Sequence, residues 1–261
     1  MLRKIATLAV AAGLVAAASP ALATPLYGGN NGKFLSINQS SGAATQISTA
    51  TPDGIGALAW DFTNQVMYGG SSDNFFKIAA NGTQTTINST TTHNIDALVF
   101  GPGNVLYGVD TSAQVLYTVN PSNGAMTWLL GASPLSELAY DPTTSTLYAR
   151  AGSSLVKVNP INGTHTIVGT LSGFGDAVDA ISVDPVTGQM YGETNPLFGG
   201  GKLWTINKAT GAATALVGQT GLGAGASAGW VFSMAFVPEP GTMLLLGMGL
   251  VGLGVSGRKK A

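Results

Sequence analysis

Carboxylates are the groups in this sequence best suited to bind a ligand or move a proton, because the chain has no cysteine and only two histidines. Six of them recur at two equivalent places of a repeated pattern, ahead of Ala-rich apolar stretches and after a Tyr-containing motif. These six are Asp96, Glu137 and Asp179, and Asp73, Asp110 and Glu193. A ring of such oxygen ligands could coordinate Ca²⁺ or accept hydrogen bonds from sugar hydroxyls. The alternative is that they cap strand ends and solvate loops.

The two histidines are not expected to form a pair. His93 precedes an Ala-rich stretch on the side of the carboxylates, whereas His165 follows a turn near the opposite rim. An enzyme that uses histidine as general base needs that side chain at the reacting face. We therefore predict no catalytic residues, and the assignment as an enzyme stays open, with a non-enzymatic role favoured.

Aromatic side chains offer a second way to bind a sugar. Phe198 and Trp230 lie in or beside long glycine-rich loops, where we expect them to be exposed and able to stack on sugar rings. Trp60, Trp128 and Trp204 fall within predicted strands and are expected in the core. Phe198 and Trp230 therefore join the six carboxylates as the predicted ligand face.

Net charge excludes one class of partner. Between residues 24 and 237 the chain carries eleven acidic and six basic side chains, a net charge of about −5. Nucleic-acid binding requires a basic patch. We therefore predict no nucleic-acid partner.

The body of the chain is a repeat. A triplet of an apolar residue, Tyr and a small residue occurs five times, with its tyrosines spaced by 41, 39, 41 and 43 residues. They are Tyr27, Tyr68, Tyr107, Tyr148 and Tyr191. An apolar run in the same phase ends in Asn in four copies, with Gly four residues later, whereas Asn81-Gly82 predicts a two-residue turn in the second copy. A period of about 40 residues with four short strands is the size of one propeller blade.

We therefore predict an all-β, five-bladed β-propeller over residues 24–237, with four-stranded antiparallel blades and the Ala-rich strand innermost. Residues 232–236 are expected to complete a sheet with residues 26–47, a one-plus-three closure that leaves no open edge. An open β-solenoid is the alternative. The repeats, including Val-Asn-Pro-x-x-Gly and Ala-Tyr-Asp-Pro, resemble those of YVTN and NHL propellers. This resemblance implies an architecture and no particular activity.

The N-terminus, residues 1–23, has the layout of a secretory signal. Arg3 and Lys4 precede an apolar run, and Ala21-Leu-Ala23 is a small-residue cleavage pattern. We predict a signal helix that signal peptidase removes after Ala23. The alternative is an uncleaved membrane helix, which needs roughly 20 apolar residues.

The C-terminus, residues 238–261, has the layout of a sorting anchor. Pro238, Glu239 and Pro240 precede an apolar run, and a basic cluster of Arg258, Lys259 and Lys260 follows it. The positive-inside rule predicts a short transmembrane helix whose basic end stays in the cytoplasm. This arrangement resembles the PEP-CTERM sorting signal. The resemblance implies a Gram-negative bacterium, an exosortase-type protease that cleaves near the tripeptide, and transfer to the cell surface, often in organisms that make exopolysaccharide.

Together these features predict an exported protein, transiently anchored in the inner membrane and then held at the cell surface or in a biofilm matrix. Its propeller would bind exopolysaccharide or serve a structural role there, with Ca²⁺ the only cofactor considered. It would touch a membrane only through the anchor, for which an ordinary membrane tail is the alternative. The alternative function is a secreted glycan lyase or hydrolase that uses Asp96, Glu137 and Asp179.

Overall fold

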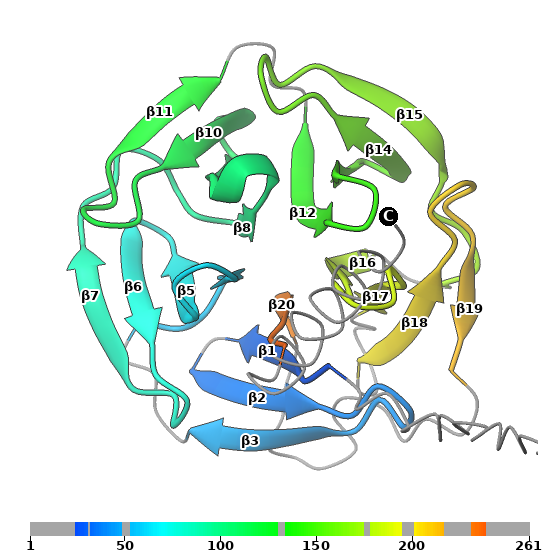
Figure 1. Ribbon diagram of the computed structural model, residues 1–261, viewed down its shortest axis with the longest axis horizontal. Helices are drawn as coiled ribbons and strands as arrows, with labels where there is room; N and C mark the ends of the chain where they lie inside the picture. Colours follow the sequence, from blue (N-terminus) through cyan, green and yellow to red (C-terminus); the bar gives the residue numbers. More distant parts are fainter. Residues whose placement is uncertain are drawn as a thin grey trace, which may run out of the picture.

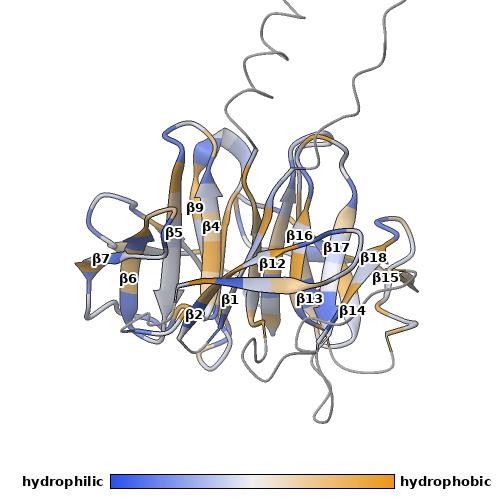
Figure 2. Cartoon of the chain, turned by 90° about the horizontal axis from the view of Figure 1, so that it is seen from below, coloured by the Kyte–Doolittle hydropathy of each residue, from blue (hydrophilic) through white to orange (hydrophobic). Residues whose placement is uncertain are grey.

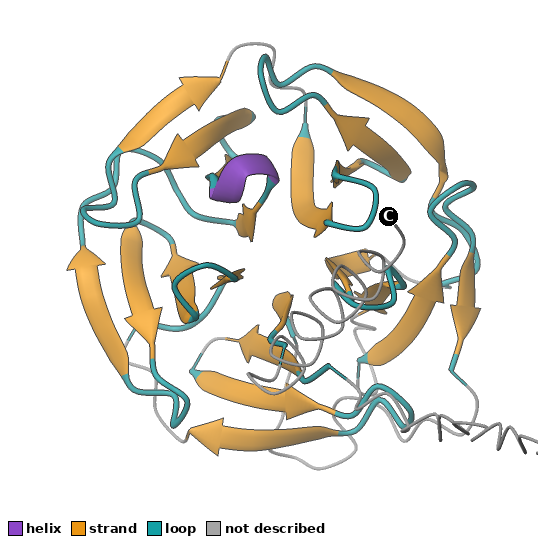
Figure 3. Ribbon diagram, viewed as in Figure 1, coloured by secondary structure: helices purple, strands orange, loops and turns teal. Residues whose placement is uncertain are grey.

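The computed structural model describes residues 24–30, 32–48, 53–129, 134–174, 178–194, 201–216 and 231–238. Within these ranges the strands form five four-stranded sheets, arranged as blades around a common axis (Figure 1). Strands and turns account for nearly all of the described chain, apart from one short 3-10 helix, η1 (Pro102–Asn104) (Figure 3). The predicted all-β, five-bladed propeller is confirmed. The two predicted terminal helices lie outside the described residues.

Each blade is an antiparallel sheet whose four strands run in order from the innermost to the outermost. Blade 1 comprises β20 (Ser233–Phe236), β1 (Leu26–Asn30), β2 (Lys33–Ile37) and β3 (Ala44–Ser48). Blade 2 comprises β4 (Ala57–Asp61), β5 (Val66–Ser71), β6 (Asn74–Ile78) and β7 (Gln84–Asn88). Blade 3 comprises β8 (Ala97–Phe100), β9 (Leu106–Asp110), β10 (Val115–Val119) and β11 (Met126–Leu129). Blade 4 comprises β12 (Leu135–Asp141), β13 (Thr146–Ala151), β14 (Ser154–Val158) and β15 (His165–Thr170). Blade 5 comprises β16 (Val178–Val183), β17 (Met190–Thr194), β18 (Lys202–Ile206) and β19 (Ala213–Ala215).

The ring closes where the two ends of the described chain meet. Strand β20 pairs antiparallel with β1, with Leu26 opposite Phe236 and Gly29 opposite Ser233. The innermost strand of blade 1 therefore comes from the end of the chain, and its other three strands come from the start. This confirms the predicted one-plus-three closure and is inconsistent with an open solenoid.

The core consists of the interfaces, or seams, between neighbouring blades. Side chains of the inner strand alternate between two seams: Ala57 and Ala59 of β4 face blade 3, while Leu58 packs against Phe34 and Ala235 of blade 1. Each sheet is therefore covered on both faces by apolar side chains. In side view the hydrophobic colour follows the strands and the hydrophilic colour gathers at the turns (Figure 2).

In blades 2, 3 and 5 the turn between the third and fourth strands packs against the blade before it. In blade 3, Gly124 has φ of 70° and its amide donates to the carbonyl of Asn120. A Cβ on Gly124 would lie 2.7 Å from Cβ of Asn88 in blade 2, so only glycine fits. In blade 2 the turn has three residues, 80–82, between the bonded Ala79 and Thr83. The predicted two-residue turn is therefore wrong, because an extra residue carries the chain over Ser48 of blade 1.

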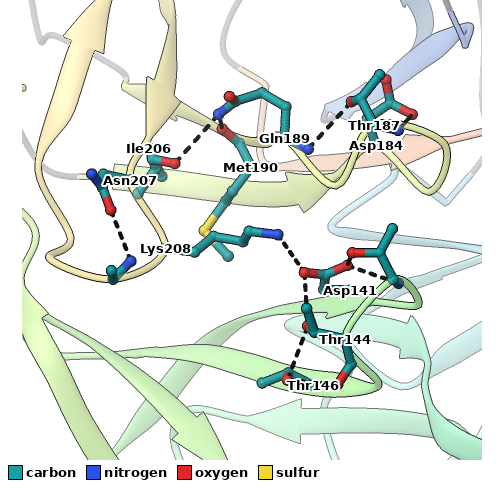
Figure 4. Close-up of polar contacts among 12 residues, drawn as sticks. Asp141, Thr144, Thr146, Asp184, Thr187, Gln189, Met190, Ile206, Asn207 and Lys208 are labelled. Atoms are coloured by element: carbon teal, nitrogen blue, oxygen red, sulfur yellow. Dashed lines mark hydrogen bonds and ion pairs between the residues drawn. The ribbon is translucent and has the colours of Figure 1, made fainter.

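The ring has two faces. The upper face holds the starts of the inner strands, and the lower face holds their ends. On the lower face three inner strands end in, or are followed by, a buried aspartate that accepts a polar contact from the next blade. These contacts join Asn104 to Asp61, Lys208 to Asp141 and Thr24 to Asp184. Figure 4 shows the contact between Lys208 and Asp141.

The other two blades lack this contact because their sequences differ at the same position. Blade 3 has Gly101 and blade 1 has Val237 where the others have aspartate.

No helix among the described residues is long and apolar enough to cross a membrane.

Candidate ligand-binding face

The six predicted carboxylates lie toward the upper face, but most are in strands rather than in loops. Glu137 is the third residue of β12, Asp179 the second of β16, and Glu193 the fourth of β17. Asp110 ends β9, Asp96 directly precedes β8, and Asp73 is exposed in the turn between β5 and β6. Four of the six are therefore strand residues, and only Asp96 and Asp73 lie outside the strands.

Local irregularities in blades 4 and 5 place two of these carboxylates. In blade 4 the pairing jumps from Leu135 to Leu138 on β12, so that Ser136 and Glu137 together face Arg150. In blade 5 the pairing skips Asp179 on β16. Such β-bulges re-aim side chains and are common beside functional sites. Among the described pairs that include an inner strand, only those of blades 4 and 5 have such a shift; the two outer strands of blades 1, 2 and 4 also have one between them.

The second residue after the repeated tyrosine is uncharged in blades 1 and 2, where it is Gly29 and Gly70. A Cβ on Gly29 would lie 2.2 Å from Cγ2 of Ile55, and a Cβ on Gly70 would lie 2.2 Å from Cγ2 of Ile95, each isoleucine belonging to the following blade. The isoleucine thus fills the space that a side chain would need. In blades 4 and 5 the equivalent residues are Arg150 and Glu193, so the charged chemistry of this rim is concentrated on one side of the ring.

Glu193 is the most unusual of these side chains. It is completely buried, and neither carboxyl oxygen has a hydrogen-bond partner among the described residues. Its Oε1 lies only 2.0 Å from the point where a Cβ on residue 201 would stand, so Gly201 leaves room for it. Burial, together with the nearby charges of Asp179 and Glu137, raises the pKa of Glu193 to about 9. The carboxyl group is therefore protonated at neutral pH.

Glu137 is the second perturbed carboxylate. Burial raises the pKa of Glu137 well above its usual value, Arg150 opposes this, and Asp179 and Asp96 raise it further. Arg150 itself has a buried Nε without a hydrogen-bond partner among the described residues. Asp179 and Asp96 thus lie close enough to Glu137 to raise its pKa, and Asp179 and Glu137 lie close enough to Glu193 to raise its pKa. The structure adds Arg150, which sequence reasoning missed although it stands two residues after Tyr148.

Asp96 and Asp110 are instead used to hold the backbone. Asp96 accepts hydrogen bonds from the amide and hydroxyl of Thr111, at 2.7 and 2.6 Å. Asp110 accepts from the amides of Asn94 and Ala113, at 3.0 and 2.8 Å. These contacts are those of the alternative interpretation, in which the acidic residues cap strand ends.

The histidines lie far apart in the blades. Nδ1 of His93 is 3.6 Å from Asp110 Oδ2, and its ring stacks on Tyr117 with 5.7 Å between centroids. His165 begins β15, the outermost strand of blade 4. Neither histidine is among the groups that perturb Glu137 or Glu193.

The described residues offer no metal centre. No three His, Asp or Glu side chains within them are grouped so that they could hold a metal ion. The Ca²⁺ prediction therefore has no support from this part of the chain.

The space between the five inner strands is small. It is a cavity of about 30 Å³ with Leu58, Leu98 and Met234 among its lining residues.

The tryptophan predictions have mixed outcomes. Trp128 is 61% exposed on β11, so its assignment to the core is wrong, because the outermost strand of a blade has solvent on one side. Trp204 is buried and bonds through its indole N–H to Thr194 Oγ1, at 2.9 Å. Trp60 is half-buried. Phe198 and Trp230 lie outside the described residues.

The processing residues also fall largely outside the described chain. Only Pro238 is described, and it is buried, one residue after Val237 and two after the end of β20. The remaining ones are Ala21, Ala23, Glu239, Pro240, Arg258, Lys259 and Lys260.

Sequence reasoning missed one motif. Ser227 stands in Gly-Ala-Ser-Ala-Gly at residues 225–229, which has the Gly-x-Ser-x-Gly spacing of a nucleophile elbow. These residues also lie outside the described part of the chain.

Solved structures with a similar fold support the architecture alone. One is a symmetrical protein studied for its de novo evolutionary emergence, with a TM-score of 0.57 and 17% identity over 83% of this chain and 100% of that one. A gluconolactonase from Xanthomonas campestris matches with a TM-score of 0.52 and 12% identity, over 77% and 78% of the two chains. A structure of the nidogen/laminin complex matches with a TM-score of 0.52 and 14% identity, over 71% and 74%. A comparison with curated proteins gives no match.

A family model does match the C-terminus. Residues 236–260 fit the PEP-CTERM protein-sorting motif. The match begins at Phe236, the last residue of β20, so the motif follows the final strand of the ring without a linker. This chain therefore carries a PEP-CTERM sorting motif at the end of a five-bladed β-propeller.

Proposed function

We propose that this protein is a non-enzymatic surface or matrix protein, exported by its signal peptide and trimmed near Pro238-Glu239-Pro240 by an exosortase-type protease. One observation supports this most: the sorting motif directly follows the strand that closes the ring. Trimming near the motif would leave the closing strand β20 intact. The processed propeller, residues 24 to about 238, would then bind or organise exopolysaccharide outside the cell.

Processing is tested by mass spectrometry of the protein recovered from the cell surface and medium. We expect an N-terminus at Thr24 and a C-terminus near Pro238. A variant with Pro238, Glu239 and Pro240 changed to alanine should keep its C-terminal residues and fractionate with the membrane. Recovery of wild-type surface protein that still contains Arg258, Lys259 and Lys260 would contradict the proposal.

Polysaccharide binding is tested separately with the processed protein. It should be retained by exopolysaccharide from the same culture and eluted by excess soluble polysaccharide. The absence of retention would remove the binding role while leaving the sorting claim standing.

A second candidate function is a secreted glycan lyase or hydrolase. The raised pKa values of Glu137 and Glu193 favour it, because a general acid must keep its proton near neutral pH. Release of reducing or unsaturated ends from exopolysaccharide, abolished by Glu137→Gln but unaffected by Asp73→Asn, would support this function. Equal release by Glu137→Gln and wild type would refute it.

A further inference from the structure

A cavity of about 390 Å³ opens at the seam between blades 1 and 2, away from the acidic rim. Its walls include Tyr27 of β1, Trp60 of β4 and Val237, and its floor includes the buried Met67 and Ile78. This is within the size range of small-molecule sites, which are mostly apolar with a few polar groups. Its described lining includes none of the residues predicted from the sequence to bind a ligand.

At this seam, as far as the chain is described, two contacts found at other seams are missing; the seam between blades 3 and 4 also lacks the first, at Gly101. The first is the interblade aspartate, since Val237 stands where blades 2, 4 and 5 have Asp61, Asp141 and Asp184. A valine side chain cannot accept a hydrogen bond from the next blade. The lower edge of this seam is therefore not fastened as aspartates fasten the seams between blades 2 and 3, 4 and 5, and 5 and 1.

The second is an aromatic contact across the seam. Tyr68 of blade 2 contacts Phe100 of blade 3 at 5.7 Å between ring centroids, and Tyr191 of blade 5 contacts Phe236 of blade 1 at 5.5 Å. Tyr27 and Trp60 occupy the same two positions, and both line the cavity. Tyr27 stacks on Phe34 of its own blade, at 5.2 Å, and no ring contact joins it to Trp60 among the described side chains.

The chemistry of this cavity matches an uncharged sugar. The C–H faces of a sugar ring pack against aromatic rings, whose faces carry partial negative charge, while its hydroxyls need polar partners at the rim. Exposed Gln65 and Thr85 line the cavity and could serve as those partners. Among the described lining residues Lys77 is the only charged one and none is a carboxylate. The ammonium group of Lys77 lies over the ring of Tyr68, 5.9 Å from the centroid, on the opposite face of the blade.

We propose that the seam between blades 1 and 2 binds one or two neutral sugar units of a polysaccharide, held between Tyr27 and Trp60. This inference rests on the proposed polysaccharide-binding function and gives it a location. It also places that site on the lower face, at the opposite end of the inner strands from Glu137 and Asp179.

The test uses the processed full-length protein with neutral pentasaccharides of glucose (maltopentaose, cellopentaose and laminaripentaose) and with the native exopolysaccharide. Affinity is measured by calorimetry and by quenching of tryptophan fluorescence. We expect Trp60→Ala to weaken binding at least tenfold and Gln65→Asn, which keeps the exposed turn and its φ of 55°, to weaken it about threefold. Trp128→Ala removes an equally sized but exposed ring on β11 and should change nothing.

The outcomes separate this inference from the proposed function. Polysaccharide binding that survives both Trp60→Ala and Gln65→Asn overturns the seam site and leaves the function standing. No binding of any saccharide by wild type overturns both. Quenching by a peptide of residues 237–242, or by an apolar dye, with no quenching by any saccharide means that the cavity takes another occupant, and the proposal is wrong.

Discussion

Both faces of the ring bury carboxyl groups, but Asp61 and Asp141 on the lower face are charged, whereas Glu193 on the upper face is neutral. On the lower face Asp61 and Asp141 are completely buried, and hydrogen bonds outweigh the effect of burial. Burial alone would raise their pKa values, but Asn64, Asn104 and Thr63 lower that of Asp61, and Lys208, Thr143 and Thr144 lower that of Asp141. On the upper face Glu193 is equally buried, has no such donors among the described residues, and has a pKa of about 9.

This difference shows how partners decide the role of a buried carboxyl group. With donors supplied by the next blade, the charged form is stabilised and the group fastens two sheets together. Without donors, the group is neutral and costs stability whenever it ionises. The lower aspartates are therefore structural, and Glu193 is the group whose burial the fold itself does not explain.

The largest effect is expected from Asp141→Ala. It leaves the ammonium group of Lys208, which is 24% exposed, without its partner, and it removes the acceptor of Thr143 and Thr144. Breaking a buried pair costs about 3–5 kcal/mol, to be measured by urea unfolding. Asp73→Ala, an exposed acidic residue of the upper face, is the control and should stay within about 0.5 kcal/mol. Equal effects of the two changes would erase the contrast between the faces.

A smaller loss is expected from Asn104→Gly. The side chain of Asn104 donates to Asp61 across the seam, at 3.0 Å, and glycine tolerates its φ of 59°. Losing a hydrogen bond to a charged group costs about 1.5–3 kcal/mol. Ser145→Gly makes the same change at φ of 50° in blade 4, where the side chain spans no seam, and should be neutral or slightly stabilising. Destabilisation by Ser145→Gly equal to that of Asn104→Gly would show that the backbone, not the contact, matters.

The remaining prediction, the one specific to the upper face, is a change in pH dependence with Glu193→Gln. Because the folded pKa of Glu193 is raised to about 9, the folded state holds a proton that the unfolded state releases near pH 4. Stability from this group is complete below that pH and is lost as pH rises toward 9. Between pH 5 and 9 the Tm of wild type should fall by at least about 2–4 °C more than that of Glu193→Gln, the shift that 1 kcal/mol produces in a domain of this size. Parallel Tm profiles would show that Glu193 is ionised in the folded protein.

The fold was predictable because the repeat records it directly. Evenly spaced tyrosines such as Tyr68 and Tyr107 indicated the number of blades, and the Ala-rich stretches indicated the radial order. The closure followed from the incomplete first and last repeats. What failed was local: the turn at Asn81-Gly82 and the exposure of Trp128 depend on how neighbouring blades meet, which the period does not encode.

The candidate site was predictable only in part. Acidic residue types at the starts of inner strands identified the upper rim, but Arg150 was missed because it occupies a position that is glycine in blades 1 and 2. The bulges at Ser136-Glu137 and Asp179 leave no mark in the spacing of the motifs. The seam cavity was missed because its lining residues come from separate strands and turns of two blades, and the repeat does not encode how closely these meet.

The direction of β20 determines the face of the ring at which the described chain ends. This strand runs from Ser233 at the upper face to Phe236 at the lower face, and Leu26 of β1 begins beside its end. The chain therefore leaves the ring from the lower face. A propeller attached to a membrane through residues beyond Pro238 would turn Asp61 and Asp141 toward the lipid and display Glu137 and Asp179 to the outside.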